Sequence, residues 1–358
     1  MSQKARQYIS RIADLTLADR PLAGGKSASL GELIRAGVRV PPGFVVLTRA
    51  FDAFLRPAET EIRSEIAKLE LHDAAQVAAA SEQIRTRIQA MPVPDDIAET
   101  IRRHYHELSH NGAGCPVAVR SSATCEDSES ASFAGLQDTY LWVRGEEMLI
   151  EQVRACWASL YNSESITYRR RLDLPEQQIA MAVVVQQMVD AKCAGVMFTR
   201  SPTTGDKSVI VIEASWGLGA SLVSGEVTPD RFVINKVTGE VVKSDISDKQ
   251  LEHVAEPSGI GVRVQAVDEA RRRVPCLADD DLRELWQTAR TVEQHYGTPQ
   301  DIEWAICVPA DSGKRTVNLL QSRPETVWAA RDAEPAARPA AKDFDHVLQL
   351  LGAGKNRS

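Results

Sequence analysis

Apolar residues at helical spacing and at strand spacing alternate along the chain and predict mixed α and β structure. Isoleucines four positions apart predict mainly helix over residues 61–110, and a shorter helix is expected over 26–36, ending at Gly37. Another helix is expected over 279–296, with one apolar side formed by Leu282, Leu285, Trp286, Ala289 and Val292. Runs rich in β-branched residues predict strands at residues 41–48, 115–122, 179–189, 194–200, 208–216, 231–236, 301–308 and 316–323.

Length and composition place these elements in a soluble, multi-lobed protein. The chain has 358 residues, which is long for one compact domain and sufficient for two or three packed lobes. Hydrophobic residues make up 43% and charged residues 25%, as in ordinary globular proteins. After residue 327 the sequence becomes rich in alanine and proline, which indicates a linker.

Charge and cysteine content exclude several classes of function. The net charge of −7 gives no overall basic face for nucleic acid, and the arginine triplets at 169–171 and 271–273 are expected on solvated helix faces. The six cysteines form no C-x-x-C pair, so neither a disulfide framework nor a structural zinc site is expected. No signal-type segment and no apolar run of roughly 18 residues occurs, so no membrane contact and a cytoplasmic location are expected.

A glycine-rich loop near the N-terminus presents a lysine. In AGGKSASLGEL (23–33), Gly24 and Gly25 free the backbone, and Lys26 at a helix start would direct its ammonium at phosphate oxygens. The segment is not a Walker A loop, because Arg20 stands where that pattern needs its first glycine. By itself the pattern fits equally well a glycine turn followed by an exposed lysine.

An arginine is followed by a long loop of small hydroxyl residues in VAVRSSATCEDSESASFAGLQDTYLWV (117–143). Arg120 ends a predicted strand, and its guanidinium offers a bidentate fork to phosphate. Small residues allow backbone amides to close over a polyphosphate, and loops of this length are usually functional or disordered. The alternative for Arg120 is an ion pair with Glu126 or Asp127.

Alternation along the last two predicted strands brings charged side chains together. Asp301 and Glu303 share one strand face, opposite Ile302, Trp304 and Ile306, and such a carboxylate pair suits Mg²⁺ held against phosphates. In the next strand one face is expected to carry Val317, Leu319, Gln321 and Arg323. If the two strands pair, the carboxylates meet an amide and a guanidinium. The alternative is an edge-strand salt bridge, which contributes little energy.

Several segments together resemble one known family. The chain is similar, from about residue 12 to residue 327, to the N-terminal nucleotide domain of the phosphoenolpyruvate synthase and pyruvate phosphate dikinase family, which includes rifampicin phosphotransferases. The resemblance rests on ordered blocks: GGKSASLGEL, VRSSATCEDSESASFAGLQDT, VQQMVDAKCAGVMFT, ASWGLGASLVSGEVTPD, DIEW and LLQSRPET. It implies an α/β (α+β) fold class, an ATP-grasp fold with lobes at 1–182 and 183–327 and a tail at 328–358.

The resemblance also implies ligands and a role for each matching residue. ATP and Mg²⁺ would be bound between the lobes, with Asp301 and Glu303 on the metal. The other implied contacts are Lys26 and Arg120 with the phosphates, Gly135 and Thr139 in a covering loop, Gln187, Met188 and Val189 as the adenine hinge, Glu213 near the ribose, and Gln321 and Arg323 on the transferring phosphoryl group.

Members of this family carry a phosphohistidine domain, and none of the seven histidines here lies in its Thr-Cys-His setting. His104, His106, His110 and His295 are expected at the surface. The chain is therefore either a piece of a longer enzyme or a subunit that phosphorylates a histidine on a separate swivelling subunit, which would bind the acceptor. It looks most like the nucleotide-binding subunit of phenylphosphate synthase, and the terminal GAGKNRS is taken as a native end. The alternatives are a nucleotide-binding regulator and a stand-alone ATP-grasp ligase.

Overall fold

The computed structural model describes residues 8–110, 112, 114–124, 138–172, 174, 179–309 and 313–333. The chain divides into two compact units, Met1–Pro324 and Glu325–Ser358. In the second unit the described residues contain helix α12, Val327–Ala333, and the rest of the predicted Ala/Pro-rich tail lies outside the described residues. Among the helices of the described part, none is both long enough and apolar enough to cross a membrane.

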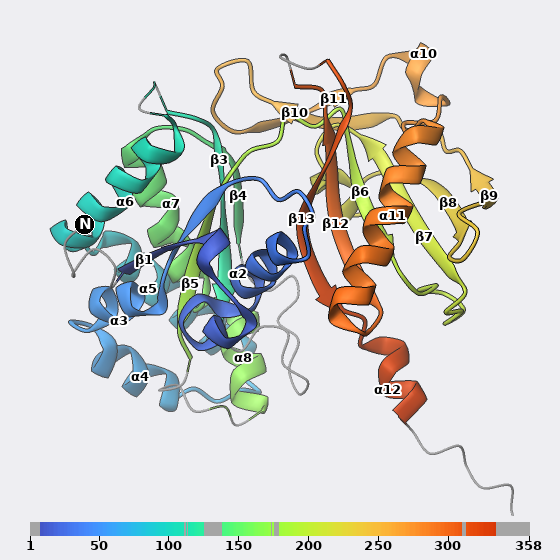
Figure 1. Cartoon of the computed structure of the whole chain (residues 1–358). Helices are drawn as coiled ribbons and strands as arrows, with labels where there is room; N and C mark the ends of the chain where they lie inside the picture. The colour runs from blue at the N-terminus through green and yellow to red at the C-terminus, as the bar shows by residue number, and fades with distance from the viewer. Residues whose placement is uncertain are drawn as a thin grey trace, which may run out of the picture. The chain divides into compact units, whose positions relative to one another are not determined.

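The first unit contains a five-stranded antiparallel sheet in the order β1-β2-β5-β3-β4 (Figure 1). Its strands are β1 (Ile9–Arg11), β2 (Gly43–Val46), β3 (Val117–Ala123), β4 (Thr139–Val143) and β5 (Met181–Gln187). The helices that follow β2 and β4 are α3 (Thr48–Leu55), α4 (Glu59–Ala67), α5 (Ala74–Ala90), α6 (Asp95–Leu108), α7 (Glu146–Ser159) and α8 (Ser163–Arg171). Val119 and Val183 face a core shared with these helices, in which Trp157 stacks on Phe54 with ring centroids 4.7 Å apart.

The second sheet has six antiparallel strands in the order β13-β12-β6-β7-β8-β9. These are β6 (Cys193–Phe198), β7 (Val209–Trp216), β8 (Asp230–Asn235), β9 (Val241–Asp245), β12 (Gln300–Cys307) and β13 (Thr316–Pro324). The segments between these strands contain the hairpin β10 (Leu251–Ala255) and β11 (Val262–Ala266), the short helices α9 (Ala220–Val223) and α10 (Glu269–Arg272), and α11 (Asp279–Tyr296). Two short 3-10 helices, Ile12–Asp14 and Leu17–Asp19, precede helix α2 (Arg20–Arg35) near the N-terminus.

Helix α11 covers one face of the second sheet, as its apolar side predicts (Figure 1). Its first turn contains three aspartates, which favour a helix N-terminus, and it ends at Gly297 in the left-handed conformation with φ 70°. Beneath it Trp304 is fully buried against Gly195 of the neighbouring strand. A Cβ on residue 195 would lie 2.7 Å from the Trp304 ring and 1.9 Å from the Glu213 carbonyl oxygen, so only glycine fits there.

Helix α2 (Arg20–Arg35) joins the two sheets. Leu30 and Leu33 share an apolar cluster with Val184 of the first sheet and Trp304 of the second. The helix is interrupted at Gly24, which has φ 75° and ψ 171°, and a Cβ there would lie 2.1 Å from the Ser122 carbonyl oxygen. The predicted helix is confirmed, and Lys26 lies at the start of its second part.

Some expectations from the sequence need correction. His104 was expected at the surface, but it is buried against the Phe44 ring, because it lies on the inner face of α6 and bonds the Thr100 carbonyl oxygen. Arg169 was expected on a solvated face and is fully buried, where it donates to the Leu160 carbonyl oxygen. The five described cysteines are free thiols.

The predicted lobe boundary after residue 182 falls within β5, at the centre of the first sheet. The chain passes from the first sheet to the second between Gln187 and Cys193. The division into lobes at 182/183 stays a prediction.

Candidate functional site

The two carboxylates of the DIEW segment meet their predicted partners across β12 and β13. Glu303 is directly opposite Gln321, and Asp301 is opposite Arg323, with 3.5 Å between Asp301 Oδ2 and Arg323 Nε. Ile302, Trp304 and Ile306 are buried on the opposite face. The pairing of these strands, and the face that carries the carboxylates, are therefore as predicted.

A β-bulge changes the face of β13. The sequence predicted that Val317, Leu319, Gln321 and Arg323 share one face, and this is wrong. Leu319 pairs with Trp304 and is buried in the core, whereas Gln321 pairs with the preceding residue, Glu303. Leu320 is therefore an extra residue on β13 that has no partner on β12. A bulge of this kind moves the side chains that follow it to the other face of the strand. Gln321 and Arg323 consequently lie on the carboxylate face.

Arg120 reaches this face from the first sheet. Its Nη2 donates to Glu303 Oε2 at 3.0 Å and to Gln321 Oε1 at 2.9 Å, and its Nη1 donates to the Leu320 carbonyl oxygen at 2.8 Å. In the part of the chain that the structure describes, Arg120 forms its ion pair with Glu303, whereas Glu126 and Asp127 of its own loop lie outside the described residues. Only 13% of the Arg120 side chain is exposed, compared with 34% for Glu303.

Lys26 lies beside the strand that carries Arg120. Its Nζ donates to the Ser121 carbonyl oxygen at 3.1 Å, and the Ser27 amide donates to Ser122 Oγ at 3.2 Å. Glycine at position 24 permits this close approach of α2 to β3. The two cations that the sequence assigned to phosphates therefore come from adjacent segments of the first sheet region.

The predicted hinge has most of its amides already engaged. Gln187 donates its amide to the Pro42 carbonyl oxygen and Met188 donates its own to that of Pro116, each at 2.9 Å. Among the described residues the Val189 amide has no acceptor. A nucleotide base at this position would therefore find one free amide, that of Val189, together with carbonyl oxygens.

Glu213 lies in the same cross-strand row as Glu303. Val196 of β6 separates them, and Arg231 of β8 is the next partner of Glu213, with 3.9 Å between Arg231 Nε and Glu213 Oε1. Arg231 was not among the residues predicted from the sequence. Alternation in RFVINK places Arg231 on one strand face, but the pattern alone does not say what that face meets.

Thr139 begins β4 directly opposite Arg120 and is exposed. Gly135, and most of the loop predicted to cover the phosphates, lie outside the described residues. These two positions therefore keep their roles as predictions.

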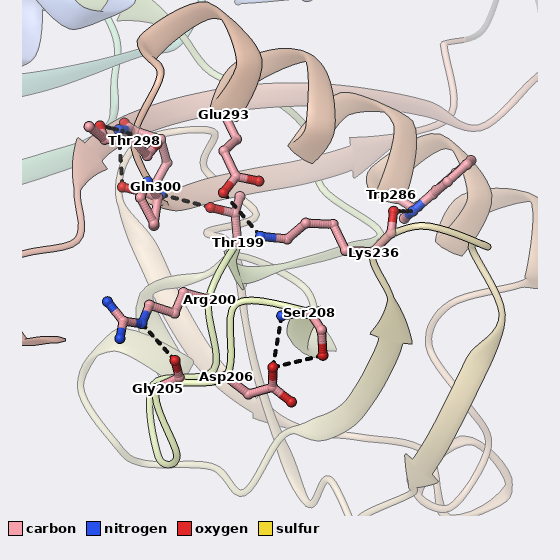
Figure 2. A network of polar contacts seen from close by, with 11 residues as sticks. Thr199, Arg200, Gly205, Asp206, Ser208, Lys236, Trp286, Glu293, Thr298 and Gln300 are labelled. Carbon is pink, nitrogen blue, oxygen red and sulfur yellow. Dashed lines mark hydrogen bonds and ion pairs between the residues drawn. The ribbon is translucent and has the colours of Figure 1, made fainter. Parts of the chain in front are cut away.

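Hydrogen bonds fix the ends of the strands that carry Asp301 and Arg323. The Gln300 amide donates to Thr199 Oγ1 at 2.8 Å, and Ser322 Oγ donates to Gln300 Oε1 at 2.9 Å. Figure 2 shows Thr199 and Gln300 beside the ion pair of Lys236 and Glu293, which attaches the turn after β8 to α11. The carboxylate face is thus held by bonds among β6, β12 and β13.

Comparison with known proteins adds the family. The family described as "Pyruvate phosphate dikinase, AMP/ATP-binding domain" matches residues 20–343. The chain belongs to this family. The resemblance found in the sequence is therefore confirmed at the level of the family, and so is the fold class, an ATP-grasp fold with mixed helices and antiparallel sheets.

Curated relatives of this AMP/ATP-binding domain are longer proteins. The chain is 38% identical to a probable phosphoenolpyruvate synthase of Staphylothermus marinus, and the match covers 97% of this chain and 45% of the relative. It is 40% identical to a probable phosphoenolpyruvate synthase of Methanothermobacter thermautotrophicus, over 98% of this chain and 50% of the relative. It is also 40% identical to a rifampicin phosphotransferase of a Streptomyces species, over 88% of this chain and 35% of the relative. The chain spans about half or less of the length of these relatives.

The donor set of the AMP/ATP-binding domain fits a magnesium ion that is shared with phosphates. No group of three or more His, Cys, Asp and Glu residues able to hold a metal occurs in the part of the chain that the structure describes. Asp301 and Glu303 supply two carboxylates, with the Gln321 amide oxygen beside them, and all three are oxygen donors. Mg²⁺ typically uses one or two protein carboxylates and completes its shell with water and substrate phosphates.

Proposed function

We propose that the chain binds ATP with Mg²⁺ between the two sheets and transfers a phosphoryl group to a histidine on a partner subunit. The partner would then phosphorylate a hydroxyl acceptor. Overall, ATP, water and the acceptor alcohol would give AMP, free phosphate and the phosphorylated acceptor. One phosphoryl group of ATP thus goes to the acceptor and the other is released to water.

The observation that carries this proposal is the convergence of Arg120 with Glu303 and Gln321. Phosphoryl transfer needs mainly positioning and neutralisation of charge. Lys26, Arg120 and Arg323 would bind phosphate oxygens, and Gln321 would orient the transferring group. Asp301 and Glu303 would hold Mg²⁺, which supplies further neutralisation of the phosphate charge when bound.

The partner histidine is proposed because none of the histidines of the chain lies in a Thr-Cys-His setting, and several of the described ones pair with carboxylates. His106 Nε2 lies 2.7 Å from Glu146, His253 Nε2 lies 2.9 Å from Glu226 and His295 Nε2 lies 2.9 Å from Glu32. His104 is buried, where its ring nitrogen bonds the Thr100 carbonyl oxygen. A swivelling subunit would therefore supply the phosphohistidine.

For the acceptor we favour phenol, as in phenylphosphate synthase, on the resemblance to its nucleotide-binding subunit. Two alternatives come from the names of the relatives, phosphoenolpyruvate synthase and rifampicin phosphotransferase. In these alternatives the same domain would supply the phosphoryl group that is transferred to pyruvate or to rifampicin. A purely regulatory nucleotide-binding role would not require the transfer residues to meet as they do.

Mg·ATP should bind the isolated chain with saturation in isothermal titration calorimetry. Lys26→Ala should weaken this binding by about 10- to 150-fold, because a lost hydrogen bond to a charged group costs about 1.5–3 kcal/mol. Lys243→Ala is the matched control, since Lys243 lies on β9 in an exposed pair with Asp245. A folded wild-type chain that releases no heat with Mg·ATP would refute the nucleotide site.

Reconstitution tests the transfer and the acceptor. The chain is mixed with its candidate swivelling subunit, Mg·ATP and phenol, pyruvate or rifampicin, and AMP and the phosphorylated product are measured. AMP together with phenylphosphate is the expected result. The chain alone with ATP labelled at the β-phosphate should acquire no phosphohistidine. If pyruvate or rifampicin is consumed and phenol is not, the proposed acceptor is wrong and the consumed compound takes its place. If ADP is the sole nucleotide product, the two-phosphoryl mechanism is ruled out.

A further inference from the structure

Arg120 holds the proposed magnesium ligand Glu303 in a contact that crosses from one sheet to the other. Three hydrogen bonds join its guanidinium to Glu303, Gln321 and the Leu320 carbonyl oxygen, at 2.8–3.0 Å. Arg120 Nε is buried without a hydrogen-bond partner in the described part of the chain. Arg120 is therefore both the predicted phosphate ligand and the present partner of a predicted metal ligand.

The second carboxylate has a cationic neighbour as well, since Arg323 Nε lies 3.5 Å from Asp301 Oδ2. The two pairs differ in burial. The Arg323 side chain is 41% exposed and that of Arg120 is 13% exposed. Water screens a charge pair less when it is buried. The Arg120–Glu303 contact is thus the stronger of the two obstacles to a cation on this face.

A guanidinium and a divalent cation cannot both use Glu303 well. Each needs the carboxylate lone pairs, and the two positive charges repel each other when they share a carboxylate. Triphosphate removes the conflict, because its oxygens can accept the fork of Arg120 and also complete the shell of the cation.

We propose that Arg120 acts as a latch that makes binding of the divalent cation depend on the nucleotide. Without nucleotide, Arg120 retains Glu303 and Gln321 and excludes the cation. The triphosphate draws Arg120 away, which releases Glu303 to the metal and Gln321 to the transferring phosphoryl group. The latch rests on the proposed function, since it assigns the order of events at the same site.

The latch is tested by the binding of Mn²⁺ without nucleotide, followed by electron paramagnetic resonance of the free ion. Mn²⁺ shares the preference of Mg²⁺ for carboxylate and water ligands. Arg120→Ala should bind Mn²⁺ at least tenfold more tightly than the wild type, which corresponds to about 1.4 kcal/mol. Arg231→Ala is the matched control, because it removes one positive charge from the same sheet face without touching Glu303. Its affinity for Mn²⁺ should change less than threefold.

Equal tightening in both variants would mean a general effect of charge, and no tightening in Arg120→Ala would mean that no latch exists. Either result overturns the proposal. Arg120→Gln serves as a second variant if Arg120→Ala has a lowered thermal midpoint.

A measurement with bound nucleotide distinguishes failure of the latch from failure of the proposed function. A saturating non-hydrolysable ATP analogue should raise the Mn²⁺ affinity of the wild type at least tenfold and that of Arg120→Ala much less, because the coupling between two ligands is reciprocal. If the analogue binds the wild type and the two proteins gain equally, the latch fails and the nucleotide site survives. If the analogue does not bind the wild type, the proposed function itself fails.

Discussion

Replacing Arg323 with alanine should lower AMP formation in the reconstituted system by about 100- to 1,000-fold, the usual effect of removing one donor that stabilises transition-state charge. Arg323 is directed to the carboxylate face by the bulge at Leu320 and lies beside Asp301. The free energy of unfolding should change by less than about 1 kcal/mol, because an ion pair with a side chain that is 41% exposed contributes little. This variant should therefore lose AMP formation while its free energy of unfolding stays close to that of the wild type.

Arg290→Ala is the control for this experiment. Arg290 lies on α11, where its guanidinium covers the Trp286 ring at 4.9 Å. Its loss should leave the rate of AMP formation within about twofold of the wild type, since α11 packs on the sheet face opposite to the one that carries Asp301 and Glu303. A wild-type rate in Arg323→Ala, with the partner subunit still bound, would remove Arg323 from the transfer set.

Replacing Lys249 with methionine should lower the free energy of unfolding by about 3–5 kcal/mol, because breaking a buried ion pair leaves a charge uncompensated. Lys249 and Asp230 are both fully buried, and Nζ lies 2.5 Å from Oδ1. Asp230 also accepts the amides of Ser247 and Cys276, each at 3.0 Å. The pair therefore ties β8 to the segments before β10 and before α11. Urea denaturation followed by circular dichroism measures the change.

Lys243→Met is the matched control on the adjacent strand β9. Lys243 also pairs with an aspartate, Asp245, at 2.7 Å, but the two side chains are 60% and 49% exposed. Such an exposed pair contributes about 0.2–1 kcal/mol. If both methionine variants lose the same small amount, burial does not govern the energy of these pairs and the argument for Lys249 is wrong.

Local patterns predicted most of the secondary structure. Helix α11 was predicted over 279–296 and occupies Asp279–Tyr296, because its apolar side, acidic start and glycine end all lie within one stretch of chain. The strand alternation that set Asp301 and Glu303 opposite Trp304 is likewise a local property of an extended backbone. Expectations failed where a residue's surroundings come from other segments, as for His104, which lies against the Phe44 ring.

The sequence by itself determined the family, through ordered blocks, and the residue types available for phosphate and metal. The meeting of Asp301 and Glu303 with Gln321 and Arg323 was predicted from the two strands, but only the tertiary structure decided which residues of the first sheet join them. Arg120 and Glu303 are 183 positions apart, and no periodicity relates them. The bulge at Leu320 depends on the register between two strands, so alternation within β13 could not reveal it. The place of Arg231 beside Glu213 follows only from the pairing of their two strands. Composition and spacing are local, whereas contacts between distant segments follow from how the sheets pair and pack.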